Sequence, residues 1–329
     1  MLDFDPKITP MRDQLLEGHP IVLRSYFVLT PTIEWAYKQV REQVWLSMPS
    51  VYFQSVPRMG KTQCATATVE ILRKDFPNRY VKFVTADIAR EDSIIQSMVK
   101  AIGLVVKPRT KLSGIRDAVI DHIICELASL GSTHFILVLD EMQALDYRDY
   151  QHLQVLQNIL STRGLKLTTV GFAQTEIEAV RNSLHAGKHM AILARFLGRK
   201  IDFVGCGSVE WLSSILAYFD EGSAYPYGSK CSFTEFFLPN AFHAGFRLMS
   251  VADEIYKHSM NCVVAAGAQT IPTEHIFLTM SYLLVGARLK DVDGFKFDEK
   301  DIKSAIASSE MSQFAALMGA KPPSGLDHE

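Results

Sequence analysis

Short apolar runs alternate with longer amphipathic segments through the first two thirds of this chain. The short runs predict strands at 51–56, 80–86, 134–140, 166–172 and 200–204. Between them, apolar residues at helical spacing predict helices at 62–75, 92–102, 112–130, 150–163, 174–184 and 189–197. Strands that alternate with helices in this way are typical of a parallel sheet covered on both faces. We therefore expect an α/β domain with a five-stranded parallel sheet.

The segments on either side follow a different pattern. The first thirty residues are polar and contain several prolines, and a helical pattern opens at Pro31. After Gly205 the strand-like runs stop, and helical patterns follow near 208–220, 245–259, 272–286 and 299–318. We therefore predict an N-terminal extension at 1–30, the α/β domain at 31–207, a small helical domain at 208–320 and a disordered tail at 321–329.

A phosphate-binding motif lies between the first predicted strand and the helix that follows it. Residues 55–62 read Ser-Val-Pro-Arg-Met-Gly-Lys-Thr, which is close to the P-loop pattern G-x-x-x-x-G-K-[ST]. The glycine lets backbone N–H groups approach the phosphates, the lysine reaches the β- and γ-phosphates, and the threonine hydroxyl can ligate Mg²⁺. We expect the nucleotide to contact Ser55, Pro57, Arg58, Met59, Gly60, Lys61, Thr62 and Gln63.

This motif departs from the standard P-loop at two positions. Ser55 stands where the first glycine is usual, and Pro57 lacks a backbone N–H. The loop therefore has one donor fewer for phosphate oxygens. We expect this to affect the rate of turnover more than the binding of ATP.

The third predicted strand ends in two adjacent carboxylates, Asp140 and Glu141. Any strand that leaves a core tends to end on polar residues, so the pair alone is weak evidence. It follows the lysine of the P-loop by roughly eighty residues, however, and parallel sheets gather their ligands at the carboxyl ends of the strands. As a Walker B motif, Asp140 would hold Mg²⁺ together with Thr62, and Glu141 would polarise the attacking water. The two motifs predict a protein that binds ATP or GTP.

Composition excludes several other classes of protein. The chain has 329 residues, 48% of them hydrophobic, and 34 Lys and Arg against 36 Asp and Glu, so any contact with nucleic acid must come from a local patch. Its five cysteines are odd in number and form no CxxC pair, which argues against a disulfide framework or a zinc site. No signal peptide and no run of about eighteen apolar residues is present. We expect a cytoplasmic protein with no membrane contact.

An α/β P-loop domain followed by helices resembles the AAA+ ATPases, and this resemblance implies roles for further residues. Gln174, at the end of the fourth predicted strand, resembles sensor 1, with Thr175 as the next candidate. Arg195 resembles the arginine finger that a neighbouring subunit supplies, with Arg199 as the alternative. Arg247, which opens a helix of the second domain, resembles sensor 2 and would reach the nucleotide from there.

Within AAA+, residues from about 30 to 260 resemble the TnsC/TniB regulators of DNA transposition, including those of CRISPR-associated transposons. The resemblance is carried by Asp-Glu-Met-Gln-Ala-Leu at 140–145 and Val-Gly-Phe-Ala-Gln-Thr-Glu at 170–176. Met142 and Phe172 depart from the pattern that is usual in this family. The resemblance implies a slow, regulatory ATPase that assembles into a ring or helical filament on double-stranded DNA. It also implies partners, namely transposase subunits and a target-selector protein.

One basic segment is the predicted DNA contact. Between Ser93 and Arg116 the sequence contains no acidic residue but five cations, Lys100, Lys107, Arg109, Lys111 and Arg116. Such a segment can follow a phosphate backbone, which gives binding without strong sequence specificity and with a steep dependence on salt. Two alternatives stay open. One is an ExeA-like ATPase that switches protein contacts without DNA, and the other is a nucleotide binder with negligible turnover.

Overall fold

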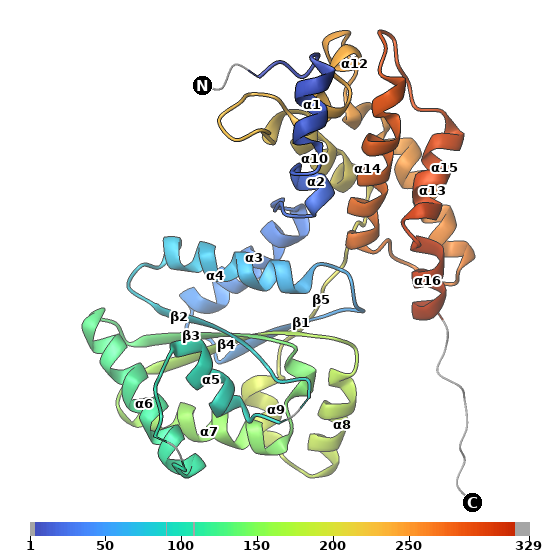
Figure 1. The fold of residues 1–329 in the computed structure, drawn as a ribbon. Helices are drawn as coiled ribbons and strands as arrows, with labels where there is room; N and C mark the ends of the chain where they lie inside the picture. The colour runs from blue at the N-terminus through green and yellow to red at the C-terminus, as the bar shows by residue number, and fades with distance from the viewer. Residues whose placement is uncertain (1–3, 90, 108, 320–329) are drawn as a thin grey trace, which may run out of the picture. The chain divides into compact units, whose positions relative to one another are not determined.

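The computed structural model describes residues 4–89, 91–107 and 109–319. They form two compact units, drawn together in Figure 1. The α/β unit is Thr32–Phe203, and the helical unit combines the described residues up to Pro31 with those from Val204 onward. The disordered tail predicted at 321–329 lies outside the described residues.

The α/β unit contains the predicted five-stranded sheet, in which every strand pairing is parallel. The strands are β1 (Ser50–Gln54), β2 (Tyr80–Thr85), β3 (His134–Asp140), β4 (Lys166–Ala173) and β5 (Lys200–Asp202). Their spatial order is β2-β3-β4-β1-β5. Strand β4 therefore lies between β3 and β1, so that the residue after β4 falls between the residues after the other two.

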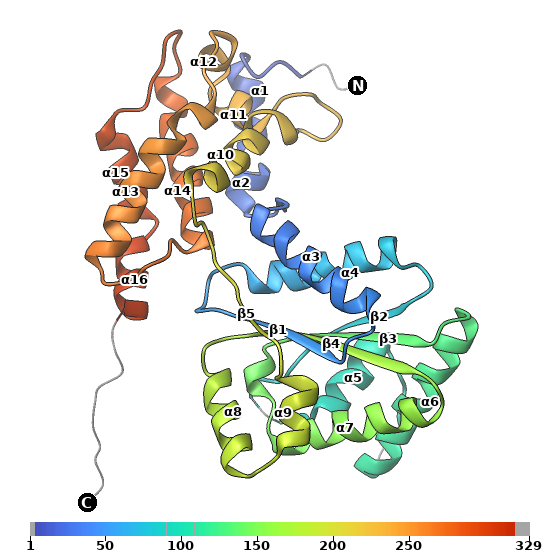
Figure 2. The ribbon, with the colours of Figure 1, turned by 180° about the vertical axis from the view of Figure 1, so that it is seen from behind.

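Helices cover both faces of this sheet (Figures 1 and 2). Alternate residues of β1 explain how, because Val51 and Phe53 are buried in the core on one face and Tyr52 in the core on the other. On the first face lie α3 (Pro31–Trp45) and α4 (Lys61–Asp75). On the second face lie α5 (Ile94–Ile102), α6 (Leu112–Ser129), α7 (Tyr147–Thr162), α8 (Ile177–Ala186) and α9 (Met190–Phe196).

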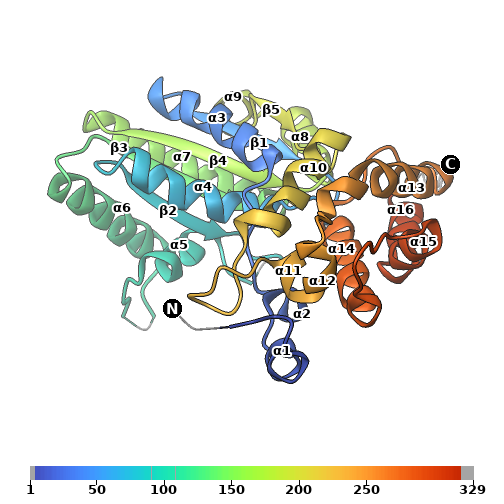
Figure 3. The same cartoon turned by 90° about the horizontal axis from the view of Figure 1, so that it is seen from above.

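The helical unit has its own aromatic and aliphatic core. Its longer helices, which Figure 3 shows from above, are α10 (Val209–Ala217), α13 (Ala252–Ala265), α14 (Thr273–Ala287), α15 (Glu299–Ser308) and α16 (Met311–Gly319). Shorter ones are α11 (Phe233–Phe237) and α12 (Pro239–His243). Within the described ranges, no helix combines the length and the apolar character that crossing a membrane requires.

The first thirty residues differ from the predicted extension. Described residues of this segment form α1 (Thr9–Leu16) and α2 (Pro20–Leu23) and belong to the helical unit. One contact comes from His19, whose buried ring lies between 4.5 and 4.9 Å, centroid to centroid, from the rings of Tyr225, Phe233, Phe236 and Phe237. With the apolar side chains of the same segment, this histidine attaches the segment to the core of the helical unit.

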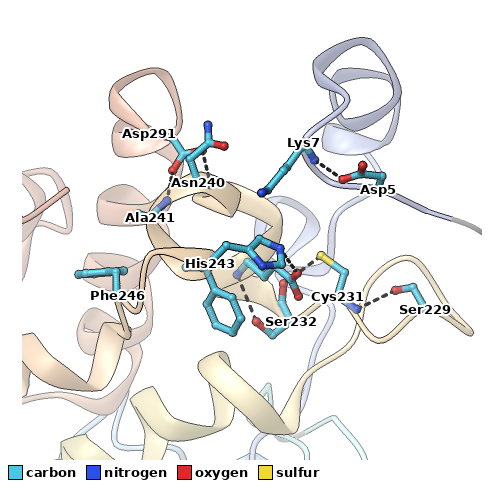
Figure 4. Close-up of polar contacts among 12 residues, drawn as sticks. Asp5, Lys7, Ser229, Cys231, Ser232, Asn240, Ala241, His243, Phe246 and Asp291 are labelled. Carbon is cyan, nitrogen blue, oxygen red and sulfur yellow. Dashed lines mark hydrogen bonds and ion pairs between the residues drawn. The ribbon is translucent and has the colours of Figure 1, made fainter. Parts of the chain in front are cut away.

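Buried and half-buried carboxylates hold the loops of the helical unit. Asp291 accepts hydrogen bonds from the backbone N–H groups of Asn240 and Ala241, both at 2.9 Å, where α12 begins (Figure 4). Asp220 accepts from the N–H groups of Leu248 and Met249, at 2.9 and 3.0 Å. Burial raises the pKa of Asp220, which these bonds partly oppose. Asp220 thereby fixes the turn that follows Arg247.

Candidate nucleotide-binding site

Three loops converge at the carboxyl edge of the sheet. Because all strands are parallel, the loops after β1, β3 and β4 leave the sheet on the same side. The backbone N–H of Ser55 donates to the carbonyl of Ala173 at 3.2 Å, which joins the start of the P-loop to the end of β4. The predicted Walker A, Walker B and sensor 1 residues are thus brought together.

Lys61 is the buried cation of this site. Only 7% of the residue is exposed, and its Nζ donates to the Ser55 carbonyl (3.0 Å), the Ser55 hydroxyl (3.0 Å) and the Val56 carbonyl (2.8 Å). Burial lowers the pKa of Lys61 to about 8, although Glu141 and Asp140 oppose the change. All three N–H donors of the ammonium group are thus directed at acceptors within the loop. A phosphate that enters the loop would replace these acceptors.

The loop that carries Lys61 adopts the backbone of a phosphate cradle. Gly60 has φ 93° and directly precedes α4, a conformation that favours glycine, and Arg58 also has a positive φ, 61°. Met59 is buried in the core under α3 and α4 and anchors the loop, while Pro57 lies in its turn. Thr62 and Gln63 are exposed in the first turn of α4. The N-terminus of this helix is therefore open to an anion.

Asp140 and Thr62 form a pair of oxygen donors. Asp140 is buried at the end of β3, with 2% exposed, and the Thr62 side chain hydrogen-bonds to it. Burial raises the pKa of Asp140, because the surroundings offer its charge too little solvation. Hydroxyl and carboxylate oxygens are the ligands that Mg²⁺ prefers. This donor set fits the predicted magnesium ion.

Glu141 follows β3 in a left-handed conformation with φ 55° and is held by two amides. Gln174 donates from Nε2 to Glu141 Oε2 at 3.1 Å, which brings the predicted sensor 1 residue to the predicted base. Gln143 Nε2 donates to the same oxygen, and Gln143 Oε1 accepts from the backbone N–H of Gln174 at 2.9 Å. Sequence reasoning did not assign a role to Gln143, although this residue lies in the Asp-Glu-Met-Gln-Ala-Leu segment at 140–145 that carries the resemblance to TnsC/TniB regulators.

The two arginine-finger candidates form contacts outside the three loops of this edge. The Arg199 carbonyl accepts from the Tyr52 N–H at 3.0 Å, just before β5 begins, which places Arg199 beside the middle of β1. Its guanidinium donates to Gln39 on α3 at 3.1 Å, whereas Arg195 donates to Asn158 on α7 at 2.6 Å. The two guanidinium groups therefore contact opposite helical layers, α3 and α7.

Arg247, the predicted sensor 2, lies in the helical unit. Its guanidinium donates to the carbonyls of Phe242 and Phe246, at 2.9 and 2.7 Å, and stacks over the Phe242 ring at 3.8 Å from the centroid. These contacts give Arg247 a structural role at the end of α12. Its predicted contact with nucleotide stays a prediction.

The five cations of the predicted DNA-binding segment separate into two groups. Lys100 pairs with Asp92, which lies one residue before the acid-free stretch, and Arg116 pairs with Asp117 at 3.3 Å. Lys107, Arg109 and Lys111 are exposed in the loop between α5 and α6. Within residues 4–89, 91–107 and 109–319, none of these three forms an ion pair. We name this group the basic loop. Of the five predicted cations, the structure thus leaves these three as the ones whose charge is not paired within the described residues.

Comparisons with known proteins identify the fold. No family model matches the sequence, and no curated protein matches it. The solved structure of the Aeropyrum pernix Orc1 protein in complex with DNA has a TM-score of 0.51 and 15% identity, covering 88% of this chain and 69% of that one. A structure of Drosophila ORC bound to DNA has a TM-score of 0.50 and 13% identity, covering 97% and 73%. These similarities, with the parallel sheet, confirm the predicted fold class, an α/β P-loop core with a five-stranded parallel sheet and a helical domain.

Proposed function

We propose that this chain is an ATP-dependent, DNA-binding AAA+ ATPase that regulates DNA transposition. The observation that supports it most is the convergence at one sheet edge of Lys61, Thr62, Asp140, Glu141 and Gln174. Each of these residue types has a defined task in nucleoside triphosphate hydrolysis. The set as a whole therefore fits this reaction better than another one.

The site divides the work of hydrolysis among its side chains. Lys61 and the backbone N–H groups before α4 bind the phosphates of ATP. Glu141 accepts a proton from the attacking water, and the Gln174 amide orients that water or the γ-phosphate. When bound by Thr62 and Asp140, Mg²⁺ would neutralise charge on the phosphate oxygens. Buried Asp140, whose charge is poorly solvated, supplies negative charge where a cation is needed.

DNA binding is supported by the basic loop and by the structural neighbours of this chain. Lys107, Arg109 and Lys111 project from one loop without acidic partners among the described residues, which suits contacts with phosphates and not with base edges. The two structural neighbours are bound to DNA in their solved structures. We infer binding to double-stranded DNA that depends on salt and only weakly on sequence.

Regulation of transposition is the finer part of the proposal. It rests on the resemblance of residues 140–145 and 170–176 to TnsC/TniB regulators, and it implies a homo-oligomer that contacts transposase subunits and a target selector. The guanidinium groups of Arg195 and Arg199 contact Asn158 and Gln39 instead of the chain's own P-loop, which supports assembly. An arginine that does not serve its own site can complete the site of a neighbouring subunit.

The test of the enzyme is a comparison of three proteins for ATP binding and release of phosphate. We expect wild type to hydrolyse ATP slowly. Glu141→Gln should retain ATP but lose about 100- to 1,000-fold in rate, because it removes the base without changing the shape of the site. Lys61→Ala should lose ATP binding itself. Equal rates for wild type and Glu141→Gln would refute the role of Glu141.

A further inference from the structure

Gln143 connects two parts of the site that lie far apart in the sequence. Its amide nitrogen donates to Glu141 Oε2, and its amide oxygen accepts from the backbone N–H of Gln174 at 2.9 Å. Gln174 in turn donates to the same Glu141 oxygen at 3.1 Å. The three residues form a closed ring of hydrogen bonds between the end of β3 and the end of β4.

The ring of hydrogen bonds fixes the orientation of the Glu141 carboxylate. A glutamate has three side-chain torsions, and at this position it follows a strand in a left-handed turn, outside any regular helix. Both amides bind Oε2, so the other oxygen, Oε1, is the one placed to take a proton from water. Fixing the carboxylate in this way lowers the entropy that must be lost when the water and the γ-phosphate come into line.

Gln143 makes more of the hydrogen bonds in this ring than the Gln174 side chain does. Removal of the Gln174 amide would delete one bond to Glu141. Removal of the Gln143 amide would delete the second bond to Glu141 and also the bond that holds the backbone of Gln174. The buried neighbours Met142 and Ala144 keep the η1 turn (Met142–Ala144) in place, so the side chain can be changed without dismantling the turn.

We propose that Gln143 is a positioning residue for ATP hydrolysis: it orients the carboxylate of Glu141 and ties it to the end of β4. This inference rests on the proposed ATPase activity. Gln143 acts through Glu141 and Gln174 and does not itself touch the reacting atoms. Its loss therefore affects the chemical step and leaves the binding of ATP unchanged.

The experiment measures steady-state ATP hydrolysis and analogue binding for Gln143→Met, which keeps the volume and removes both hydrogen bonds. We expect kcat to fall about 10- to 100-fold, with KM and the affinity for a non-hydrolysable analogue within about twofold of wild type. Gln151→Met is the matched control, because the Gln151 amide donates to the Tyr147 hydroxyl, at 2.8 Å, on the surface of α7, away from the ring of hydrogen bonds. It should behave as wild type.

A second variant, Gln143→Glu, gives a readout that a purely structural role would not move. It places a carboxylate against Glu141, and two carboxylates in contact share a proton at low pH. The introduced carboxyl group, once protonated, can donate to Glu141 Oε2 as the amide does. We therefore expect the rate of this variant, relative to wild type at the same pH, to rise by about tenfold or more as the pH falls from about 8 to about 6.

The outcomes separate the two proposals. If wild type hydrolyses ATP and Gln143→Met keeps its kcat, or if Gln143→Glu follows the wild-type pH profile, the positioning role is wrong and the ATPase stands. If Gln143→Met loses analogue binding together with rate, Gln143 supports the fold of the site and does not position the base. If wild type binds the analogue but does not hydrolyse ATP at all, both the proposed ATPase and the role of Gln143 fail.

Discussion

The α/β unit and the helical unit carry charges of opposite sign. Residues 32–203 contain 22 Lys and Arg against 17 Asp and Glu, a net of +5, while the rest of the chain contains 12 against 19, a net of −7. The near-neutral total of −2 conceals this difference. The unit with the P-loop and the basic loop is the positive one, which agrees with the proposal that this unit binds two polyanions, ATP and DNA.

Each unit also contains a buried histidine whose pKa burial lowers, but the surroundings of these two residues differ. His19 of the helical unit lies among aromatic rings, accepts from the Ile21 N–H at 3.1 Å, and has its pKa lowered by burial to about 3. His134 of the α/β unit makes a 2.8 Å hydrogen bond with the Thr168 hydroxyl, and burial lowers its pKa to about 4.

The sharpest way to break this comparison is to reverse the charge of the basic loop. Lys107→Glu, Arg109→Glu and Lys111→Glu together should weaken binding of duplex DNA by about 100-fold or more near 0.1 M salt. The slope of log affinity against log salt should become smaller by about 3, because three phosphate contacts are lost. A fluorescence anisotropy titration at several salt concentrations measures both.

The matched control for that reversal lies in the acidic unit. Lys230→Glu, Lys257→Glu and Lys300→Glu change the net charge of the protein by the same amount through exposed residues of the helical unit. DNA affinity should change far less than with the basic-loop variant. Equal losses in the two triple variants would mean that net charge, and not the basic loop, governs binding.

A second prediction concerns acid stability of the helical unit. The pKa of His19 is lower in the folded state than the ordinary value of 6.5, so the folded state binds fewer protons and stability falls as the pH drops below 6.5. Between pH 7 and 5 the helical unit should lose about 2 kcal/mol from this residue. His19→Asn, which keeps an acceptor for Ile21 and does not titrate, should abolish that loss.

Tryptophan fluorescence can follow this unit separately. The chain has three tryptophans, of which Trp35 and Trp45 lie in the α/β unit and Trp211 lies in the helical unit. Urea unfolding of a Trp35→Phe, Trp45→Phe background therefore reports on Trp211 alone. If the Trp211 transition shifts with pH to the same extent whether or not this background also carries His19→Asn, another group causes the acid sensitivity.

A third prediction compares one glycine from each unit. A Cβ on Gly171 in β4 would lie 2.2 Å from Met142 Sδ and 3.0 Å from Tyr52 Cβ, so Gly171→Ala should destabilise the α/β unit by about 1–3 kcal/mol. Gly286 in α14 has open space around it, and Gly286→Ala should stabilise the helical unit by about 0.5–1 kcal/mol. Urea unfolding should give shifts of opposite sign. An unchanged free energy of unfolding for Gly171→Ala would show that the Met142 side chain can move to make room.

The smallest predicted effect is on the pH dependence of nucleotide binding. Because burial lowers the pKa of Lys61 to about 8, the free protein loses this charge just above neutrality, whereas bound phosphate favours the charged form. Affinity for a fluorescent ATP analogue should therefore weaken about tenfold between pH 7 and pH 9. Constant affinity up to about pH 9.5 would mean that Lys61 keeps the pKa of an exposed lysine.

The sequence predicts the α/β unit closely because that unit is encoded locally. Predicted strands at 80–86, 134–140 and 166–172 correspond to β2, β3 and β4 within one residue, and the helix at 62–75 corresponds to α4. Each is marked by an apolar run or by the P-loop itself. The convergence of Lys61, Asp140, Glu141 and Gln174 then follows from the geometry of parallel strands.

What the sequence could not predict depends on contacts between distant residues. His19 looks like an ordinary residue of a polar segment until the rings from 225–237 surround it. Lys100 appears unpaired until α5 brings it to Asp92. Gln143 gains its place only when β4 delivers Gln174 beside β3. In each case the sequence does not show which residue will be the partner, because the tertiary fold brings the two residues together.

The measurement that tests the central claim most directly is anisotropy of a labelled random-sequence DNA duplex, titrated with and without a non-hydrolysable ATP analogue. We expect binding that requires the analogue, weakens steeply with salt and disappears in Lys61→Ala. No binding under any of these conditions, by protein shown to hold the analogue, would contradict the DNA-binding role and favour an ATPase that switches protein contacts.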